Sequence, residues 1–197
     1  MTGHSFGGEF SGRDADTLRL FAAVELPDAL RSRLVELKKD FPGIRWTVPE
    51  NMHLTLRFIG ELGRQEADKA RSALREVRVA PFSLCMQGLG LFERRNRNVL
   101  WAGLRTFAPL LDLKRQVDEA LAGGIGLKAE HGRFSPHITL SRIRTGVSAV
   151  LREQAACHVF ASESFAVESF TLFRSVLSPE GASHFPLERY PLPAPRM

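Results

Sequence analysis

The tetrapeptide His53-Leu54-Thr55-Leu56 recurs as His137-Ile138-Thr139-Leu140. Six His and eight Thr in 197 residues predict about 0.24 His-x-Thr triplets by chance, whereas the chain contains two. Two imidazoles could act on a phosphate held between them, one removing a proton from the attacking water and one supplying a proton to the departing oxygen. An imidazole has an ordinary pKa of about 6.5, so both protonation states are accessible at neutral pH. The Thr hydroxyls could hydrogen-bond the non-bridging phosphate oxygens.

The motifs can do this only if the backbone points their polar side chains in one direction. On a β-strand alternate side chains share a face, so His53 and Thr55 lie on one face while Leu54 and Leu56 lie on the other. The second motif follows the same alternation. Each motif therefore presents an imidazole and a hydroxyl to a cleft and anchors itself in the core through its apolar pair.

Hydrophobic periodicity and turn residues predict the elements that carry the motifs. We expect strands at residues 18–26, 52–59, 82–92, 99–104, 134–143 and 165–177. We expect helices at residues 28–40, 65–77, 108–122 and 147–156, with Asp28 as the cap of the first and Gly123-Gly124 as the stop signal of the third. The order is strand, helix, motif strand in each half, which indicates two similar lobes that share a cleft and pack as one unit.

Composition favours a globular protein that binds an anion. A hydrophobic fraction of 44% is enough for a sizeable core, and we expect one bilobal domain over residues 18–197 preceded by a flexible, Gly-rich tail over residues 1–17. The apolar runs stop far short of the roughly 18–20 residues that span a bilayer. The net charge of +5 arises from 22 Arg against five Lys. This bias favours phosphate or nucleic-acid ligands, or alternatively it only solubilises the surface.

Metal and redox chemistry are not indicated. Cys85 and Cys157 are too few for a disulfide scaffold, so we expect two reduced thiols and a cytoplasmic location. A zinc site is the obvious rival for a histidine cluster, but each motif supplies one ligand without the nearby Cys, carboxylate or i,i+4 His that zinc sites use. His131 is the spare histidine closest in sequence to a motif. We expect no metal and no cofactor.

Four segments resemble the 2H phosphoesterases. They are residues 20–27 (LFAAVELP), 53–60 (HLTLRFIG), 99–101 (VLW) and 135–142 (SPHITLSR). Within that superfamily they are similar to the bacterial and archaeal RNA 2′,3′-cyclic phosphodiesterases, also called 2′-5′ RNA ligase-like proteins. The resemblance extends from Leu18 to about Leu192.

The resemblance implies an α+β fold with a pseudo-twofold, in which antiparallel sheets line a central cleft and helices lie outside. It implies metal-independent hydrolysis of RNA 2′,3′-cyclic phosphate ends to 2′-phosphomonoesters, with reversible 2′-5′ joining of RNA ends as a second activity. By resemblance His53 is the proton donor and His137 the proton acceptor, and Arg142 binds phosphate with Thr55 and Thr139. The residues alone do not order the two histidine roles.

Two arginines close to the motifs have alternative interpretations. Strict alternation from His137 places Arg142 on the face opposite the cleft, and a bulge or the strand end could bring it back. Arg57 has the same parity as His53, so it lies either at the rim of the cleft or in solvent.

The remaining polar and aromatic candidates are better explained as surface and core. The hairpin loop Arg94-Arg95-Asn96-Arg97 could touch an RNA backbone, but a charged hairpin tip is more often only solvated. Trp46, Phe58 and Phe173 could stack on a base, and core packing is the better interpretation for each.

Two other functions fit the same residues. One is a module that binds RNA ends without turnover; the paired His argue against it, because binding alone would be served as well by Arg. The other is hydrolysis of small cyclic nucleotides. The leading hypothesis is a monomeric enzyme whose partner is RNA with 2′,3′-cyclic phosphate termini and which has no contact with membranes.

Overall fold

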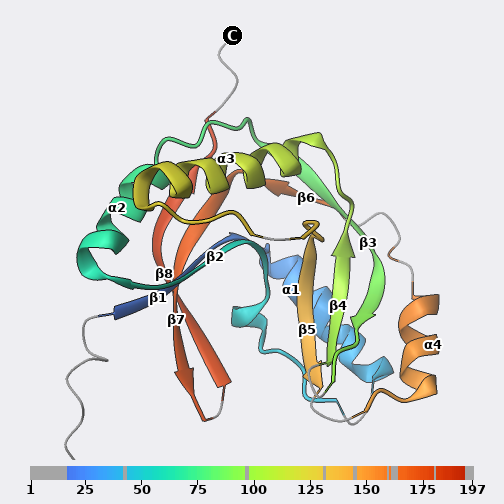
Figure 1. The fold of residues 1–197 in the computed structure, drawn as a ribbon. Coiled ribbons are helices and arrows are strands. Elements are labelled where there is room, and N and C mark those ends of the chain that lie inside the picture. Colours follow the sequence, from blue (N-terminus) through green and yellow to red (C-terminus); the bar gives the residue numbers. More distant parts are fainter. Residues whose placement is uncertain are drawn as a thin grey trace, which may run out of the picture.

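The computed structural model describes residues 17–41, 44–95, 98–130, 132–143, 146–158, 160, 164–179 and 181–193. Predictions made for residues 1–16, Asn96, Arg97 and His131 lie outside this part of the chain. In chain order the elements are β1 (Thr17–Glu25), α1 (Asp28–Glu36), η1 (Leu37–Asp40), η2 (Pro49–Asn51), β2 (His53–Gly63), α2 (Arg64–Leu74), β3 (Phe82–Phe92), β4 (Asn98–Leu104), α3 (Ala108–Ile125), β5 (His137–Ile143), α4 (Ala149–Cys157), β6 (Ser164–Val167), β7 (Ser169–Ser178) and β8 (Gly181–Pro191) (Figure 1).

The strands form one antiparallel, strongly curled sheet in the order β6-β3-β4-β5-β2-β1-β7-β8. The order has an approximate twofold centred between β5 and β2, with β4 matching β1, β3 matching β7 and β6 matching β8. The two motif strands therefore meet in the middle, each at the inner edge of a four-stranded half. This arrangement confirms the α+β class.

Burial accounts for the apolar run of β1. Leu20, Phe21, Ala22, Ala23 and Val24 are all at most 2% exposed. A strand with partners on both sides and apolar neighbours on both faces has no polar face, so it needs a continuous apolar sequence. β1 has β2 and β7 as partners, and this position makes it the rigid support of the first motif strand.

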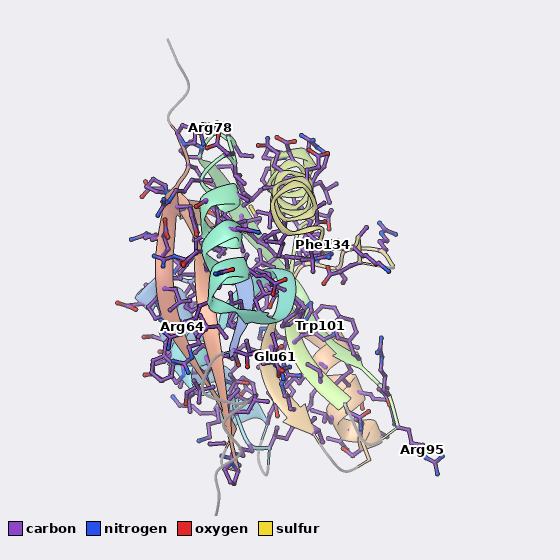
Figure 2. The ribbon with its side chains drawn as sticks, turned by 60° about the vertical axis from the view of Figure 1, so that its left-hand side comes forward. Glu61, Arg64, Arg78, Arg95, Trp101 and Phe134 are labelled. Atoms are coloured by element: carbon purple, nitrogen blue, oxygen red, sulfur yellow. The ribbon has the colours of Figure 1, made fainter. Side chains whose placement is uncertain are left out.

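The helices differ from prediction at their ends. Asp28 is the first residue of α1 and not its cap, which is Pro27. Helix α3 continues through Gly123-Gly124 and ends at Ile125, and its C-cap is Gly126, which has a left-handed φ of 67°. A Cβ on Gly124 would lie 2.5 Å from the Cβ of Ala73. Gly124 therefore lets α2 and α3 approach each other, and the two helices run side by side (Figures 1 and 2).

The C-terminal part holds more strands than predicted. The segment expected as one strand is divided into β6 and β7, and β8 follows it as an edge strand. Pro186 and Pro191 interrupt the pattern of β8, and an edge strand tolerates proline because its outer backbone groups have no partner. No helix in the described part of the chain has the length and apolar character needed to span a lipid bilayer.

Candidate functional site

The two motifs lie beside each other at equivalent positions. Strands β2 and β5 are antiparallel, and their paired residues are Leu54 and Ile138, the second residue of each motif. All four apolar motif side chains are at most 1% exposed, whereas the two His and two Thr are partly exposed. The alternation predicted from the sequence is therefore present in both strands. It brings both imidazoles and both hydroxyls to one face of the sheet, about the twofold.

A matched β-bulge lies at the last residue of each motif. Thr55 and Arg57 pair with consecutive residues of β1, which leaves Leu56 as the extra residue. Thr139 and Ser141 pair with consecutive residues of β4, which leaves Leu140 as the extra residue. One extra residue reverses the alternation beyond it. Side chains after the bulge therefore exchange faces relative to the parity of a regular strand.

The bulge after Leu140 brings Arg142 to the histidine face. Arg142 is exposed, and its positive charge lowers the pKa of His53, of His137 and of a third histidine, His184. A charge that acts on all three rings lies close to all three. The sequence left Arg142 either opposite the cleft or returned to the cleft face by a bulge or the strand end. The structure has Arg142 on the cleft face, because of the bulge.

The bulge after Leu56 turns Arg57 away from the cleft, and both interpretations of Arg57 are wrong. Its side chain is 4% exposed, and its guanidinium donates to the carbonyl of Lys128 and lies 3.5 Å from Asp118 and 3.4 Å from Glu130. Lys114 binds the same two carboxylates. Arg57 therefore fixes the segment that leads from α3 to the second motif.

His53 lies in a cluster of aromatic rings. Its ring centroid is 4.8 Å from that of Phe21, 6.2 Å from that of Phe173 and 5.2 Å from that of His184, the last in an edge-to-face arrangement. The ring also hydrogen-bonds the backbone of Asn51. Burial, followed by the charge of His184, lowers the pKa of His53 to about 4. His53 is therefore neutral at pH 7 in the free protein.

His137 has a corresponding environment in the other half. Its Nδ1 lies 2.8 Å from the carbonyl oxygen of Ser135, which can only accept, so Nδ1 carries the proton and the neutral ring leaves Nε2 free as a base. The ring meets Phe92 at 5.0 Å and Trp101 at 6.4 Å between centroids. Burial, and to a lesser degree the charge of Arg142, lowers the pKa of His137. Each motif histidine thus bonds to the backbone two residues before it and packs on aromatic rings.

The indole ring of Trp101 lies against the backbone of two glycines, Gly90 of β3 and Gly103 of β4. A Cβ added to Gly90 would lie within 2.8 Å of three atoms of its indole ring, and one added to Gly103 would lie 3.0 Å from a fourth. Phe92 meets the indole at 5.0 Å between centroids. The two glycines therefore leave room for a flat ring, which with Phe92 supports His137. Figure 2 shows Trp101 projecting from the sheet.

The aromatic residues singled out from the sequence have different fates. Trp46 is half-buried against the core and Phe173 is 7% exposed, so core packing is confirmed for both. Phe173 packs with Phe21 beneath His53 and apart from the main core. Phe58 is 61% exposed, so its predicted burial is wrong, because the bulge after Leu56 also reverses its face.

The hairpin between β3 and β4 is solvated where the structure describes it. Arg94 and Arg95 are exposed, and Figure 2 shows Arg95 extending away from the sheet. Glu93 forms two hydrogen bonds with Arg152 of α4, at 2.8 and 2.7 Å, which tie the base of the hairpin to that helix. The described part of this loop fits the solvated interpretation.

Sequence reasoning missed His184. It lies on β8, whose prolines hide the strand, and it has no motif around it. The signal that could have found it is its residue type, since it is one of only six histidines in the chain.

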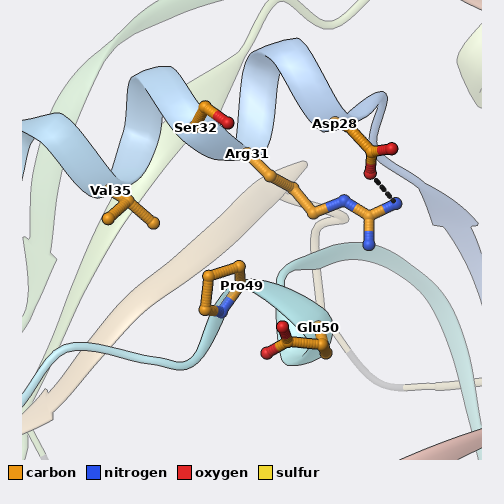
Figure 3. Close-up of a pocket in the computed structure, with 6 residues that line it drawn as sticks. All are labelled: Asp28, Arg31, Ser32, Val35, Pro49 and Glu50. Atoms are coloured by element: carbon orange, nitrogen blue, oxygen red, sulfur yellow. Dashed lines mark ion pairs between the residues drawn. The ribbon is translucent and has the colours of Figure 1, made fainter.

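A surface pocket of about 470 Å³ lies elsewhere, between α1 and η2 (Figure 3). Its lining includes Arg31, which pairs with Asp28 at 3.3 Å and donates to the Leu26 carbonyl at 2.6 Å. The motif histidines do not line this pocket, so we do not assign the chemistry to it. In the described residues no group of three His, Cys, Asp or Glu side chains is arranged to hold a metal ion.

The fold and the two matched half-sites are those of a two-histidine phosphoesterase. The family model described as "LigT like Phosphoesterase" matches residues 24–101 and residues 106–183, and each of these segments contains one motif. The chain therefore belongs to the LigT-like phosphoesterase family.

Curated and solved relatives agree with this assignment. A protein of Archaeoglobus fulgidus named RNA 2′,3′-cyclic phosphodiesterase is 30% identical over 83% of this chain and 94% of its own length. A Thermus thermophilus protein of the same name is 32% identical over 89% of this chain and 90% of its own. The crystal structure of E. coli LigT complexed with 3′-AMP superposes with a TM-score of 0.76 at 28% identity, covering 90% of this chain and 99% of that one.

Proposed function

We propose that this chain hydrolyses RNA 2′,3′-cyclic phosphate ends to 2′-phosphomonoesters, with His53 as the proton donor and His137 as the proton acceptor. The observation that carries the proposal is the pairing of Leu54 with Ile138, since it sets two His-x-Thr half-sites about one twofold on one face. The names of the relatives supply the substrate class.

The chemistry requires two proton transfers. Nε2 of His137 accepts a proton from water as the water oxygen bonds to phosphorus, and His53 donates a proton to the ribose 3′ oxygen as its bond to phosphorus breaks. Each transfer typically contributes about 10²–10⁴-fold in rate. Thr55, Thr139 and Arg142 bind the non-bridging oxygens, where negative charge accumulates. With water replaced by the 5′ hydroxyl of a second RNA, the same steps give a 2′-5′ linkage, and their reversal exchanges the two histidine roles.

The lowered pKa values make protonation depend on the substrate. A donor must carry its proton at the start, yet the pKa of His53 is about 4 in the free protein. A phosphate anion beside the ring favours the protonated form and raises that pKa. The substrate therefore brings the charge that prepares its own proton donor. Of the two motif histidines, only His53 has a large pKa shift in the free protein. Which histidine donates a proton and which accepts one is therefore decided by their protonation when substrate is bound.

Turnover by histidine variants tests the proposal. RNA ending in a 2′,3′-cyclic phosphate is incubated in EDTA with the wild type, His53→Ala, His137→Ala and the control His158→Ala, which removes a histidine outside the motifs whose ring lies against Phe160. We expect the control to match the wild type and each motif variant to lose at least about 10²-fold. Equal turnover by all four proteins refutes the proposal. Activity that disappears in EDTA refutes metal independence.

Product identity tests which ribose oxygen leaves, because release of a 2′-phosphomonoester shows that the 3′ oxygen departs. A cytoplasmic monomer is part of the same proposal. The free thiols of Cys85 and Cys157 are consistent with a reducing compartment. The net charge of +5 favours an RNA substrate over a neutral one.

A further inference from the structure

His184 belongs to the histidine face although it lies on the last strand. Its ring meets His53 at 5.2 Å and Phe21 at 4.9 Å between centroids, edge-to-face in both cases. Strand β8 places it there by pairing His184 with Ser175 of β7. The ring therefore touches both a motif histidine and the aromatic residue on which that histidine rests.

A specific contact ties the strand of His184 to the first motif. The side-chain amide of Asn51 donates to the carbonyl of Ala182 at 2.6 Å, two residues before His184. The backbone of Asn51 also bonds the ring of His53. One residue thus fixes both the ring of His53 and the strand beside it, so the approach of the two imidazoles is built into the fold.

One nitrogen of the His184 ring lacks a hydrogen bond among the described residues. Its Nδ1 is buried and finds no hydrogen-bond partner among the described residues. Leaving a buried polar atom unpaired costs about 1–3 kcal/mol, and such atoms in native proteins call for an explanation such as a functional role. Packing alone would be served better by Phe or Leu at this position.

The charges around His184 favour an anionic ligand. On β5 the charge of Arg142 acts on it, and on β2 the ring of His53 lies against it, so both of these groups are basic. On β1, Arg19 shares the face of Phe21, and Glu25 at the other end of that strand accepts a hydrogen bond from Thr171 at 2.6 Å. Burial and the charge of Arg142 lower the pKa of His184, so a bound anion is needed to hold its proton at neutral pH.

We propose that His184 is a third imidazole of the phosphate site, which takes up a proton when a phosphomonoester dianion binds and so makes the site retain the reaction product. The cyclic phosphodiester carries one negative charge, whereas the monoester carries about 1.5 to 2 at neutral pH. The reaction uses two imidazoles, and the third matches the charge that hydrolysis adds. The identity of the ligand rests on the proposed function.

Isothermal titration separates this role from packing. The ligands are adenosine 2′-monophosphate and its methyl phosphate ester, which differ by one ionisable oxygen. The proteins are the wild type, His184→Phe, which keeps a ring against Phe21 and His53, and the matched control His158→Phe. Each is titrated at pH 6 and pH 8, and at pH 7 in two buffers of different ionisation enthalpy to count the protons taken up.

We expect His184→Phe to bind the monoester about tenfold more weakly than the wild type at pH 6, because a charge-assisted hydrogen bond is lost. We expect its affinity for the methyl ester to change less than about twofold, and its proton uptake with the monoester to fall. The control is expected to match the wild type. Unchanged affinity for both ligands, or equal losses for both, refutes the proposal and leaves His184 as a packing residue. Product binding needs no turnover, so this result is independent of the histidine variants that test hydrolysis.

Discussion

Gly90 offers a test of whether the ring support beneath His137 is as tight as the structure has it. In Gly90→Ala the new methyl group would lie within 2.8 Å of three indole atoms of Trp101, so the indole must move. Overpacking of this kind costs about 1–3 kcal/mol. Removing a strand glycine returns about 0.5–1 kcal/mol through the unfolded chain. The net loss of unfolding free energy is therefore up to about 2.5 kcal/mol, which lowers the Tm by up to about 10 °C in a chain of this size.

The matched control is Gly123→Ala in α3, where a Cβ would have no atom within 4 Å. That substitution should raise the Tm by about 1–4 °C, because alanine favours a helix. Thermal unfolding followed by circular dichroism measures both effects.

Hydrolysis of cyclic-phosphate RNA should fall about 10–100-fold in Gly90→Ala alone, because the displaced indole carries Phe92 and His137 with it. Adding Trp101→Leu to Gly90→Ala should cost less than the sum of the two single changes, because the clash is gone. A Tm and activity for Gly90→Ala equal to those of Gly123→Ala would refute the reasoning.

Three further predictions concern stability, each measured as the free energy of unfolding in urea. Arg57→Met should cost about 1–3 kcal/mol, because it removes the buried hydrogen bond to the carbonyl of Lys128 and one of the two cations that Asp118 and Glu130 share, the other being Lys114. Arg57→Lys should recover part of this loss, and a cost below about 0.5 kcal/mol for Arg57→Met would contradict the buried placement. The pKa of His53 is about 4 in the folded protein and about 6.5 in the unfolded chain, so the unfolded chain binds the proton more tightly. The free energy of unfolding should therefore fall by up to about 3 kcal/mol as the pH drops from 7 to 4. His53→Gln should weaken this pH dependence, and an unchanged slope would contradict the assigned pKa. Phe58→Ser should change stability by less than about 0.5 kcal/mol, whereas Phe173→Ser should cost about 3 kcal/mol or more; equal costs would contradict the assigned burial.

The sequence was sufficient for the motifs because their signal is periodic and local. Alternation placed His53, Thr55, His137 and Thr139 on one face, and the structure has all four there. The family resemblance supplied the fold class. These are features that a few neighbouring residues decide.

The sequence was not sufficient where one inserted residue changes the geometry. A bulge has no distinctive composition at Leu56 or Leu140, yet it decides that Arg57 is buried and that Arg142 faces the histidines. Pro186 hid β8, and with it His184, because edge strands tolerate residues that interior strands exclude. Contacts between distant segments, such as that between His184 and His53, depend on the curled sheet and have no local pattern.

The pairing of Leu54 with Ile138 has a consequence for the direction in which RNA is read. A twofold between the half-sites means that a strand entering the cleft in either polarity would find a histidine and a threonine on each side of its phosphate. The motifs alone therefore do not distinguish the 5′ from the 3′ direction. The distinction must come from what differs between the halves, which includes Phe21, Phe173 and His184 around one histidine, and Phe92 and Trp101 around the other. We expect that exchanging these neighbours, with both histidines kept, would alter which ribose oxygen leaves.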